Sequence, residues 1–304
     1  MKHIPVLLNQ AVRGLNLKQG DVCVDATFGG GGHSKLISQN LGATGHLIAI
    51  DADAETLKEF DQLLKDEVCQ KTAILGNFRQ IKNLLLEKNI KEVDAILMDL
   101  GTSAGSIENS SRGFTFLKDE PLLMTFKAEI SPDDLTAKEI VNTWSEESLA
   151  DIIYGFGGEK FSRKIAKAIV EQRLVKPIET TFQLVAIIEA VVPIWYKRKR
   201  IHPATKTFQA LRIAVNDELG ALKDGLNDGF ELLKPNGRMA VISFHDLEAR
   251  IVKKFFIEKK TAGQGQIITK HAVKPEFSEI KANSRSRSAQ LRIIQKQWPD
   301  KIQN

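Results

Sequence analysis

The chain has 304 residues, of which 42% are hydrophobic and 27% are charged. This composition excludes a disordered chain, and the length predicts one large or two modest domains. No apolar run reaches the length of a membrane span, and residues 1–18 lack the apolar core and cleavage site of a signal peptide, so we expect a cytoplasmic protein without membrane contacts.

Charge and cysteine content narrow the function further. The net charge of +5 is unevenly spread, with basic clusters at 197–200 and within 283–292. Such clusters are typical of surfaces that bind phosphate backbones, and solvated charge on a helix face is the alternative. Cys23 and Cys69, the only cysteines, lie in apolar segments, which excludes a disulfide scaffold or a cysteine-rich zinc site. We expect no bound metal.

A glycine-rich turn between residues 24 and 40 carries the most informative motif. An apolar strand ends at Asp25, glycines occupy 29–32, and a helix is predicted over 33–40. Glycine is needed because a Cβ would block the tight turn and the approach of a ligand to backbone N–H groups. A second strand, 45–50, is followed by Asp51, where a carboxylate can accept hydrogen bonds from ribose hydroxyls. This pattern predicts a site for a nucleoside cofactor.

Three nucleoside cofactors use turns of this kind. A dinucleotide fingerprint requires glycine or alanine where Ser34 stands, and a phosphate-binding loop requires lysine where His33 stands. NAD and ATP are therefore disfavoured. S-adenosylmethionine (SAM) remains, because its aminoacyl tail lies over such a turn. A plain strand-to-helix connection without a ligand is the alternative.

Strands and helices continue to alternate beyond this motif. The apolar spacing predicts a helix over 54–64, a strand over 72–75, a helix over 79–88 and a strand over 93–98. This order is typical of a doubly wound parallel α/β fold, in which ligands bind beyond the carboxyl ends of the strands. We therefore expect Asp25, Asp51, Asn77 with Phe78, and Asp99 to converge on one crevice.

The alternation breaks down between residues 106 and 204, where apolar spacing predicts helices over 137–144, 148–154, 162–173 and 181–192. We interpret 106–204 as a helical domain inserted into an α/β domain made of residues 1–105 and 205–304. The α/β pattern then resumes with long helices over 206–233, a buried strand over 238–244, and a helix over 249–259.

Several motifs, distributed in order along nearly the whole chain, resemble those of one family. They occupy residues 3–8, 25–29 with 31–34, 99–101, 112–116, 202–205 with 208–212, 243–245 with 247–248, and 285–289. Together they resemble the bacterial small-subunit rRNA cytosine-N4 methyltransferases, the RsmH or MraW family. The resemblance implies a Rossmann-like class I methyltransferase fold with a helical substrate-recognition insert. It also implies SAM as methyl donor, and as acceptor a cytidine in the decoding region of 16S rRNA, either free or in the small ribosomal subunit.

The resemblance assigns cofactor contacts to residues from several strand ends and turns: Gly31, Gly32, His33, Asp51, Phe78, Asp99 and Ser106. Plain packing is the alternative for Phe78, and helix capping is the alternative for His33.

Candidate catalytic groups follow from the chemistry of the acceptor. The exocyclic amine of cytosine is a poor nucleophile, so the site needs acceptors that localise its lone pair and take a proton. Asp99, Ser243 and His245 stand at strand ends where such acceptors belong, and a structural role is the alternative for His245. Contacts with RNA phosphates are predicted for five basic side chains: Arg112, His202, Lys206, Arg285 and Arg287.

The chain departs from the family pattern on the acceptor side. Ser106 replaces a glutamine; Leu123, Thr125 and Lys127 replace two acids and an arginine; and Asp246 and Ala249 replace a serine and an aspartate. We favour methylation of the same cytidine through altered contacts. A protein that binds SAM and RNA without transfer, and a methyltransferase for another nucleic acid, are the alternatives. The oligomeric state stays open, with a homodimer as one arrangement.

Overall fold

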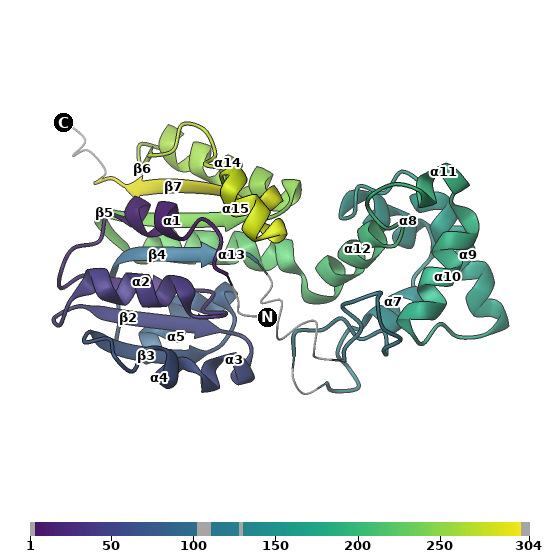
Figure 1. Cartoon of the computed structure of the whole chain (residues 1–304), viewed down its shortest axis with the longest axis horizontal. Helices are drawn as coiled ribbons and strands as arrows, with labels where there is room; N and C mark the ends of the chain where they lie inside the picture. Colours follow the sequence, from purple (N-terminus) through teal and green to yellow (C-terminus); the bar gives the residue numbers. More distant parts are fainter. Residues whose placement is uncertain (1–3, 102–110, 128–129, 299–304) are drawn as a thin grey trace. The chain divides into compact units, whose positions relative to one another are not determined.

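Short apolar segments form the strands of a single sheet in the computed structural model, which describes residues 4–101, 111–127 and 130–298 (Figure 1). The strands within these ranges are β1 (Val22–Asp25), β2 (His46–Asp51), β3 (Gln70–Leu75), β4 (Val93–Asp99), β5 (Leu233–Ser243), β6 (Gly265–Ile267) and β7 (Gln290–Lys296). Their order is β3-β2-β1-β4-β5-β7-β6. The first five strands pair in parallel, whereas β7 is antiparallel to β5 and β6.

Helices cover both faces of this sheet because alternate strand residues point to opposite sides. Leu47 and Ala49 of β2 belong to a core with α1 (Leu8–Leu15) and α2 (Gly32–Leu41). Ile48 and Ile50 belong to a second core with α5 (Ile81–Glu87), α13 (Glu218–Leu232) and α14 (Asp246–Thr261). The predicted doubly wound α/β fold is confirmed.

Several local elements differ from the sequence prediction. The helix expected over 54–64 is two short helices, α3 (Ala54–Lys58) and α4 (Phe60–Leu63), which meet at Glu59. The helix expected over 79–88 begins as a 3-10 turn, η1 (Phe78–Gln80), in which the Asn77 side chain accepts the N–H of Arg79. Helix α1 and strands β6 and β7 were not predicted, because the first is short and the last two lie in polar sequence.

The C-terminal basic cluster divides between two elements. Arg285 and Arg287 are exposed on a second 3-10 helix, η2 (Ser284–Ser288), which follows α15 (Phe277–Ala282). Arg292 instead lies in β7, where it pairs with Val241 of β5 and is half-buried. Burial lowers the pKa of its guanidinium group. Arg292 is therefore part of the sheet and not of an exposed cluster.

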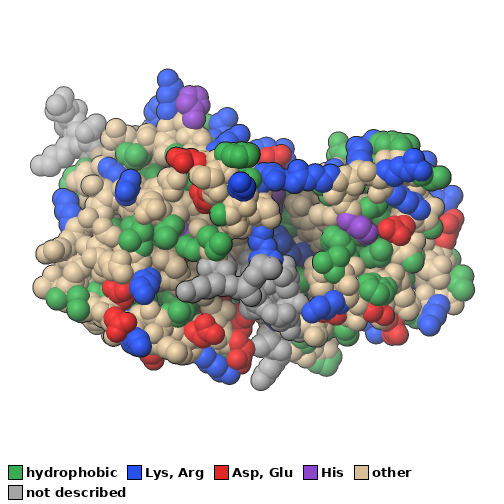
Figure 2. Space-filling view, viewed as in Figure 1, with side chains coloured by type: hydrophobic (Ala, Val, Ile, Leu, Met, Phe, Trp, Pro, Cys, Tyr) green, Lys and Arg blue, Asp and Glu red, His purple; other side chains and the backbone are tan. Residues whose placement is uncertain are grey.

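The chain forms two compact units, one made of Met1–Ala104 with Leu219–Asn304 and the other of Gly105–Glu218. The second, which we call the helical unit, contains α7 (Ala137–Thr143), α8 (Glu146–Gly155), α9 (Ser162–Val175), α10 (Thr181–Val191), α11 (Ile194–Lys197) and α12 (Thr205–Asn216). Thr136, Ser145 and Thr180 cap the first turns of α7, α8 and α10 through their hydroxyl groups. Figure 2 shows Lys and Arg side chains grouped at the edge of this unit where α11 lies.

The helical unit ends at Glu218 and includes helix α12, whereas the sequence predicted that the insert ends at residue 204. Phe208 and Leu211 of α12 are buried among side chains of α7 and α8, so this helix belongs to the core of the helical unit. Leu222, Leu226 and Phe230 of α13 belong to the core of the sheet. The long helical region predicted over 206–233 is thus shared between the two units.

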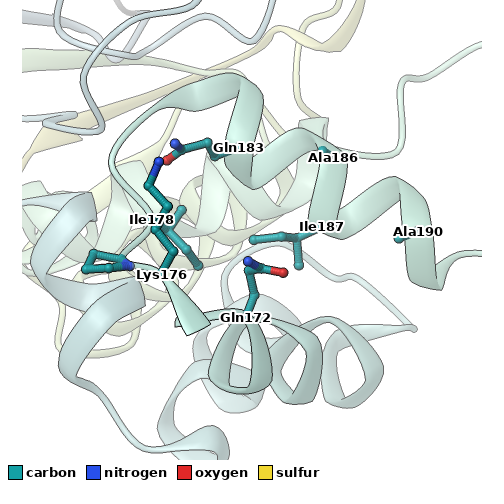
Figure 3. A pocket seen from close by; sticks show the side chains of 8 residues that line it. Gln172, Lys176, Ile178, Gln183, Ala186, Ile187 and Ala190 are labelled. Carbon is teal, nitrogen blue, oxygen red and sulfur yellow. The ribbon is translucent and has the colours of Figure 1, made fainter. Parts of the chain in front are cut away.

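The helical unit also has a hollow of about 390 Å³ between α9 and α10 (Figure 3). Apolar side chains such as Ile178 and Ile187 line it, together with Gln172, Lys176 and Gln183. Across the described parts of the chain, no helix combines the length and apolar character needed to cross a membrane.

Candidate cofactor and catalytic site

Four parallel strands of the α/β unit end in polar side chains at one edge of the sheet. The register pairs Asp25 of β1 with Ala49 of β2 and with Leu97 of β4, each two residues before an aspartate. Asp51 and Asp99 therefore end the strands on either side of Asp25. The carboxyl end of β5, beyond Ser243, is next to that of β4, where Asp99 pairs with Ile242. The structure thus brings these strand ends together as the sequence analysis expected.

The glycine turn brings backbone N–H groups close to these strand ends. Gly31 has φ +69°, a conformation that favours glycine, and precedes the first residue of α2. A Cβ on Gly32 would lie 2.7 Å from Cγ of Pro5, so only glycine fits without a shift of residues near the N-terminus. Gly31 is the N-cap of α2 and has no side chain that could cap the helix. The first turn of this ten-residue helix therefore keeps unpaired N–H groups and the positive end of the helix dipole. The turn is therefore suited to an anionic group such as a carboxylate.

Asp25, His33 and Asp99 form a buried titratable cluster behind the turn. Asp25 is fully buried and accepts hydrogen bonds from the Ser34 hydroxyl at 2.7 Å and the Thr27 N–H at 3.2 Å. Nδ1 of His33 lies 3.6 Å from Oδ2 of Asp99. Burial raises the pKa of Asp25 and lowers the pKa of His33, because both lose solvation of their charged forms.

One hydrogen bond determines which tautomer His33 adopts. Its Nε2 lies 3.1 Å from the carbonyl oxygen of Val6, which can only accept, so Nε2 carries the proton. In the neutral ring Nδ1 is then a free acceptor facing Asp99. His33 thereby connects the N-terminal segment to the carboxylate at the end of β4.

Asp99 has a strongly perturbed carboxyl group at the sheet edge. Its side chain is 14% exposed. Burial, with a smaller contribution from repulsion by Glu248, raises its pKa to about 7 against a hydrogen bond from the Gly101 N–H that favours the charged form. Its own N–H donates to the Thr27 hydroxyl at 2.7 Å, which fixes the strand end. A carboxyl group with this pKa can gain and lose a proton near neutral pH.

Asp51 and Phe78 occupy the ends of β2 and β3. Asp51 accepts hydrogen bonds from the N–H groups of Gly29 at 2.8 Å and Asp53 at 2.9 Å, and burial raises its pKa. Phe78 is half-buried, and its ring packs against α13 so closely that a Cβ on Gly225 would lie 2.7 Å from it. The Phe78 ring is thus partly packed against the core of the sheet and partly exposed.

Ser243 and His245 follow β5 and have structural partners. The Ser243 hydroxyl donates to the carbonyl of Gln290 in β7 at 3.3 Å. His245 is the N-cap of α14, where Nδ1 accepts the N–H of Glu248 at 3.4 Å and the Glu248 carboxylate accepts the N–H of His245 at 3.2 Å. Nε2 of His245 lies 3.1 Å from Oε1 of Glu248. Only Nδ1 takes part in the cap, because the buried Nε2 makes no hydrogen bond within the described residues.

The three RNA-contact candidates of the helical unit make contacts within that unit. Arg112 donates to the carbonyl oxygens of Phe126 and Lys127 at 3.1 and 2.8 Å. His202 stacks on Phe116 with 4.7 Å between ring centroids. Lys206 donates to the carbonyl of Gly158 at 2.8 Å. A role in RNA binding stays a prediction for Arg112, His202, Lys206, Arg285 and Arg287.

The acceptor-side departures are only partly described by the structure. Ser106 lies outside the described residues. Thr125 is buried and accepts the N–H of Lys127 at 3.2 Å, and Lys127 forms an ion pair with Asp134. Asp246 lies in the first turn of α14, where an acidic side chain is favourable.

Sequence reasoning missed the residues that surround the turn from the N-terminus. Pro5 packs on Gly32, and Val6 orients His33. Glu279 of α15 accepts the N–H of Leu7 at 2.7 Å and holds this segment in place. The motif at residues 3–8 was the available signal, but it gave no indication of a role because Glu279 is 272 positions away from Leu7.

The class of protein follows from the sheet order, with the antiparallel β7 between β5 and β6, and from the glycine turn and the aspartates at the strand ends. The protein is a Rossmann-like SAM-dependent methyltransferase. A model of the MraW methylase family matches residues 1–297, and the chain belongs to this family.

Two sequence relatives match this chain over nearly its whole length. Ribosomal RNA small subunit methyltransferase H of Brevibacillus brevis is 41% identical, covering 97% of this chain and 98% of the relative. The protein of the same name from Clostridium botulinum is 44% identical, covering 97% and 99%. Among solved structures, an rRNA methylase from Streptococcus thermophilus is 11% identical with a TM-score of 0.46, covering 97% of this chain and 99% of that one.

Proposed function

We propose that this protein transfers a methyl group from SAM to N4 of a cytidine in the decoding region of 16S rRNA, in the cytoplasm. Family membership and the names of the relatives support the reaction and the rRNA substrate. The observation that carries the mechanism is the buried pair of Asp99, at the end of β4, and His33, which follows the glycine turn between β1 and α2.

The residues at the sheet edge fit SAM by their chemistry. The N–H groups that follow Gly31 and Gly32 suit the carboxylate of the methionine tail, since a Cβ on either glycine would crowd its neighbours. Asp51 suits the ribose hydroxyls, because a carboxylate accepts from both. The exposed part of the Phe78 ring suits the adenine. When bound, SAM supplies a methyl group made electrophilic by its sulfonium sulfur.

Asp99 is proposed as the proton acceptor. The cytosine N4 that gains a methyl group must release one proton to become a neutral secondary amine. Asp99 as a carboxylate accepts a hydrogen bond from this amine, which localises its lone pair, and then takes the proton on Oδ2. Nδ1 of His33, 3.6 Å away, stabilises the protonated carboxyl group as an acceptor. Ser243 and His245 act at a distance from the proton transfer, by holding β5 and α14 in place.

Basic side chains hold the RNA so that one base can leave its stack and enter the site. Arg285 and Arg287, exposed on η2, are proposed phosphate contacts of the α/β unit. Arg112, His202 and Lys206 are proposed to shape the helical unit for the same RNA. Changing Arg285 and Arg287 together to alanine would then weaken RNA binding and reduce its dependence on salt.

The test is methyl transfer to small ribosomal subunits that lack the modification. The purified protein is incubated with labelled SAM, and the product is digested and mapped by mass spectrometry. We expect N4-methylcytidine in the decoding region. SAM binding with no label in any nucleic acid would overturn the proposal in favour of a binding protein, and label in another RNA would change the substrate.

A further inference from the structure

An exposed tryptophan lies among cations at the edge of the helical unit. Trp195 of α11 is 52% exposed. The ammonium nitrogen of Lys160 is 4.3 Å from the centre of its ring, and that of Lys199 is 5.1 Å away. We call Lys160, Trp195 and Lys199 the Trp195 surface. The exposed indole thus lies beside two ammonium groups, so aromatic surface and positive charge occur together.

A buried hydrogen bond holds this surface in position. The hydroxyl of Tyr196 donates to the carboxylate of Glu159, which is fully buried and also accepts the N–H of Phe161 at 2.9 Å. The rings of Trp195 and Tyr196 meet edge to face at 5.7 Å. The buried carboxylate of Glu159 therefore has one hydrogen-bond donor from the start of α9 and one from α11. Glu159 thus ties the loop before α9 to α11.

The exposed charged residues of the two segments that form this surface are all basic. Segments 160–164 and 194–201 together contain seven basic and no acidic residues. Lys160, Lys197, Arg198, Lys199 and Arg200 are all exposed. Figure 2 shows the corresponding group of blue side chains with green apolar side chains beside it. Clustered cations interleaved with an exposed aromatic ring are the chemistry that single-stranded nucleic acid requires.

We propose that the Trp195 surface binds single-stranded RNA, with a base stacked on Trp195 and adjacent phosphates held by Lys160 and Lys199. A membrane surface is the other anionic partner, but α11 has only four residues and is too short to be an interfacial amphipathic helix. That the RNA is ribosomal rests on the proposed function. This surface is separate from the residues assigned above to SAM and proton transfer.

The primary experiment measures binding of a fluorescein-labelled 12-nucleotide single-stranded RNA of mixed sequence by anisotropy. Trp195→Ala is expected to weaken affinity about tenfold because one stacked base is lost. Trp195→Phe retains a stacking face and should restore most of the affinity. The melting curve of Trp195→Ala should match that of the native protein, which separates lost stacking from misfolding.

A second measurement separates the two lysines from general charge. Each lost phosphate contact reduces the steepness of log affinity against log salt by about 0.7, so the double variant K160A/K199A is expected to reduce it by about 1.4. The matched control is K138A/K167A, because these exposed lysines of the same unit are already ion-paired with Glu179 and Glu171. An equal loss in both double variants, or native affinity in Trp195→Ala, would overturn the proposal.

Two further outcomes keep this proposal distinct from the proposed function. If the native protein methylates small subunits and Trp195→Ala leaves both KM and RNA affinity unchanged, the surface is not an RNA site and the proposed function stands. If the native protein binds RNA through Trp195 and modifies no subunit, only the proposed function is wrong. Binding to anionic lipid vesicles that Trp195→Ala abolishes, with RNA affinity unaltered, would assign the surface to membranes.

Discussion

Asp99 changes its charge near neutral pH because burial opposes ionisation of its carboxyl group, whose pKa is raised to about 7. As a proton acceptor it works only as the carboxylate. We therefore expect kcat/KM for methyl transfer to rise with pH and to level off above about pH 8.

Asp99→Asn should abolish this rise and lower kcat at least 100-fold, the usual contribution of a general base. Initial rates of label incorporation between pH 5.5 and 8.5 measure both effects, with SAM affinity determined in parallel. A native rate that does not vary with pH would exclude Asp99 as the acceptor.

The same carboxyl group links stability to pH. Its pKa is raised above the ordinary value of 3.8, so the folded state favours the neutral form, and stability falls as pH increases through the range up to about 7. A gap of about three pKa units corresponds to at most about 4 kcal/mol. Asp99→Asn is neutral at every pH. The variant should therefore melt at a higher temperature than the native protein at pH 5, and by a larger margin at pH 8, as measured by calorimetry.

The side chain of Pro5 leaves no room for a Cβ at Gly32. Gly32→Ala would place a Cβ 2.7 Å from Cγ of Pro5, so residues near the N-terminus must shift, including the Val6 carbonyl that orients His33. We expect SAM affinity to fall about tenfold in calorimetric titration. Gly155→Ala is the matched control, since its Cβ would meet nothing within 4 Å, and it should bind SAM as the native protein does.

At the scale of elements, the start of α14 decides how His245 is interpreted. A capping side chain contributes about 1 kcal/mol, so His245→Ala should lower the free energy of unfolding by about that amount. Asparagine is a good N-cap and cannot act as a base at neutral pH, so His245→Asn should keep both stability and kcat. Denaturant unfolding and the methylation assay give the two values. A large loss of kcat in the stable Asn variant would make His245 a catalytic group.

Element type could be predicted where a segment is long and strongly patterned, as in β4, α9 and α10. The strand β7 could not, because it depends on partners far along the chain. Gln290–Lys296 contains polar and charged residues and becomes a strand only because β5 and β6 supply hydrogen bonds on both sides. The site followed the same division: Asp25, Asp51 and Asp99 were expected at one edge, whereas Glu279 was found only by contact.

For the molecule as a whole, the helical region over 206–233 contributes side chains to the core of the helical unit and to the core of the sheet. Phe208 is 4% exposed in the core of the helical unit, so Phe208→Ala should cost about 3–5 kcal/mol through the cavity that it leaves. Hydrogen exchange should lose protection throughout 111–218 while β1, β2 and β4 stay protected. Phe277→Ala is the control, because its side chain is 82% exposed and its loss should change little. Equal loss of protection in the sheet would show that the units unfold together.

The sequence by itself determined the fold class, the cofactor and the family, because these depend on local chemistry: a glycine turn, acids after apolar strands and motifs in a fixed order. Only the tertiary structure decided the states of the side chains. It showed that Asp99 is buried beside His33, that His245 is occupied as a helix cap, that Arg292 lies inside the sheet, and that α12 belongs to the helical unit. Burial and long-range contacts set charge, pKa and availability, and a linear pattern does not encode which distant residues surround a given side chain.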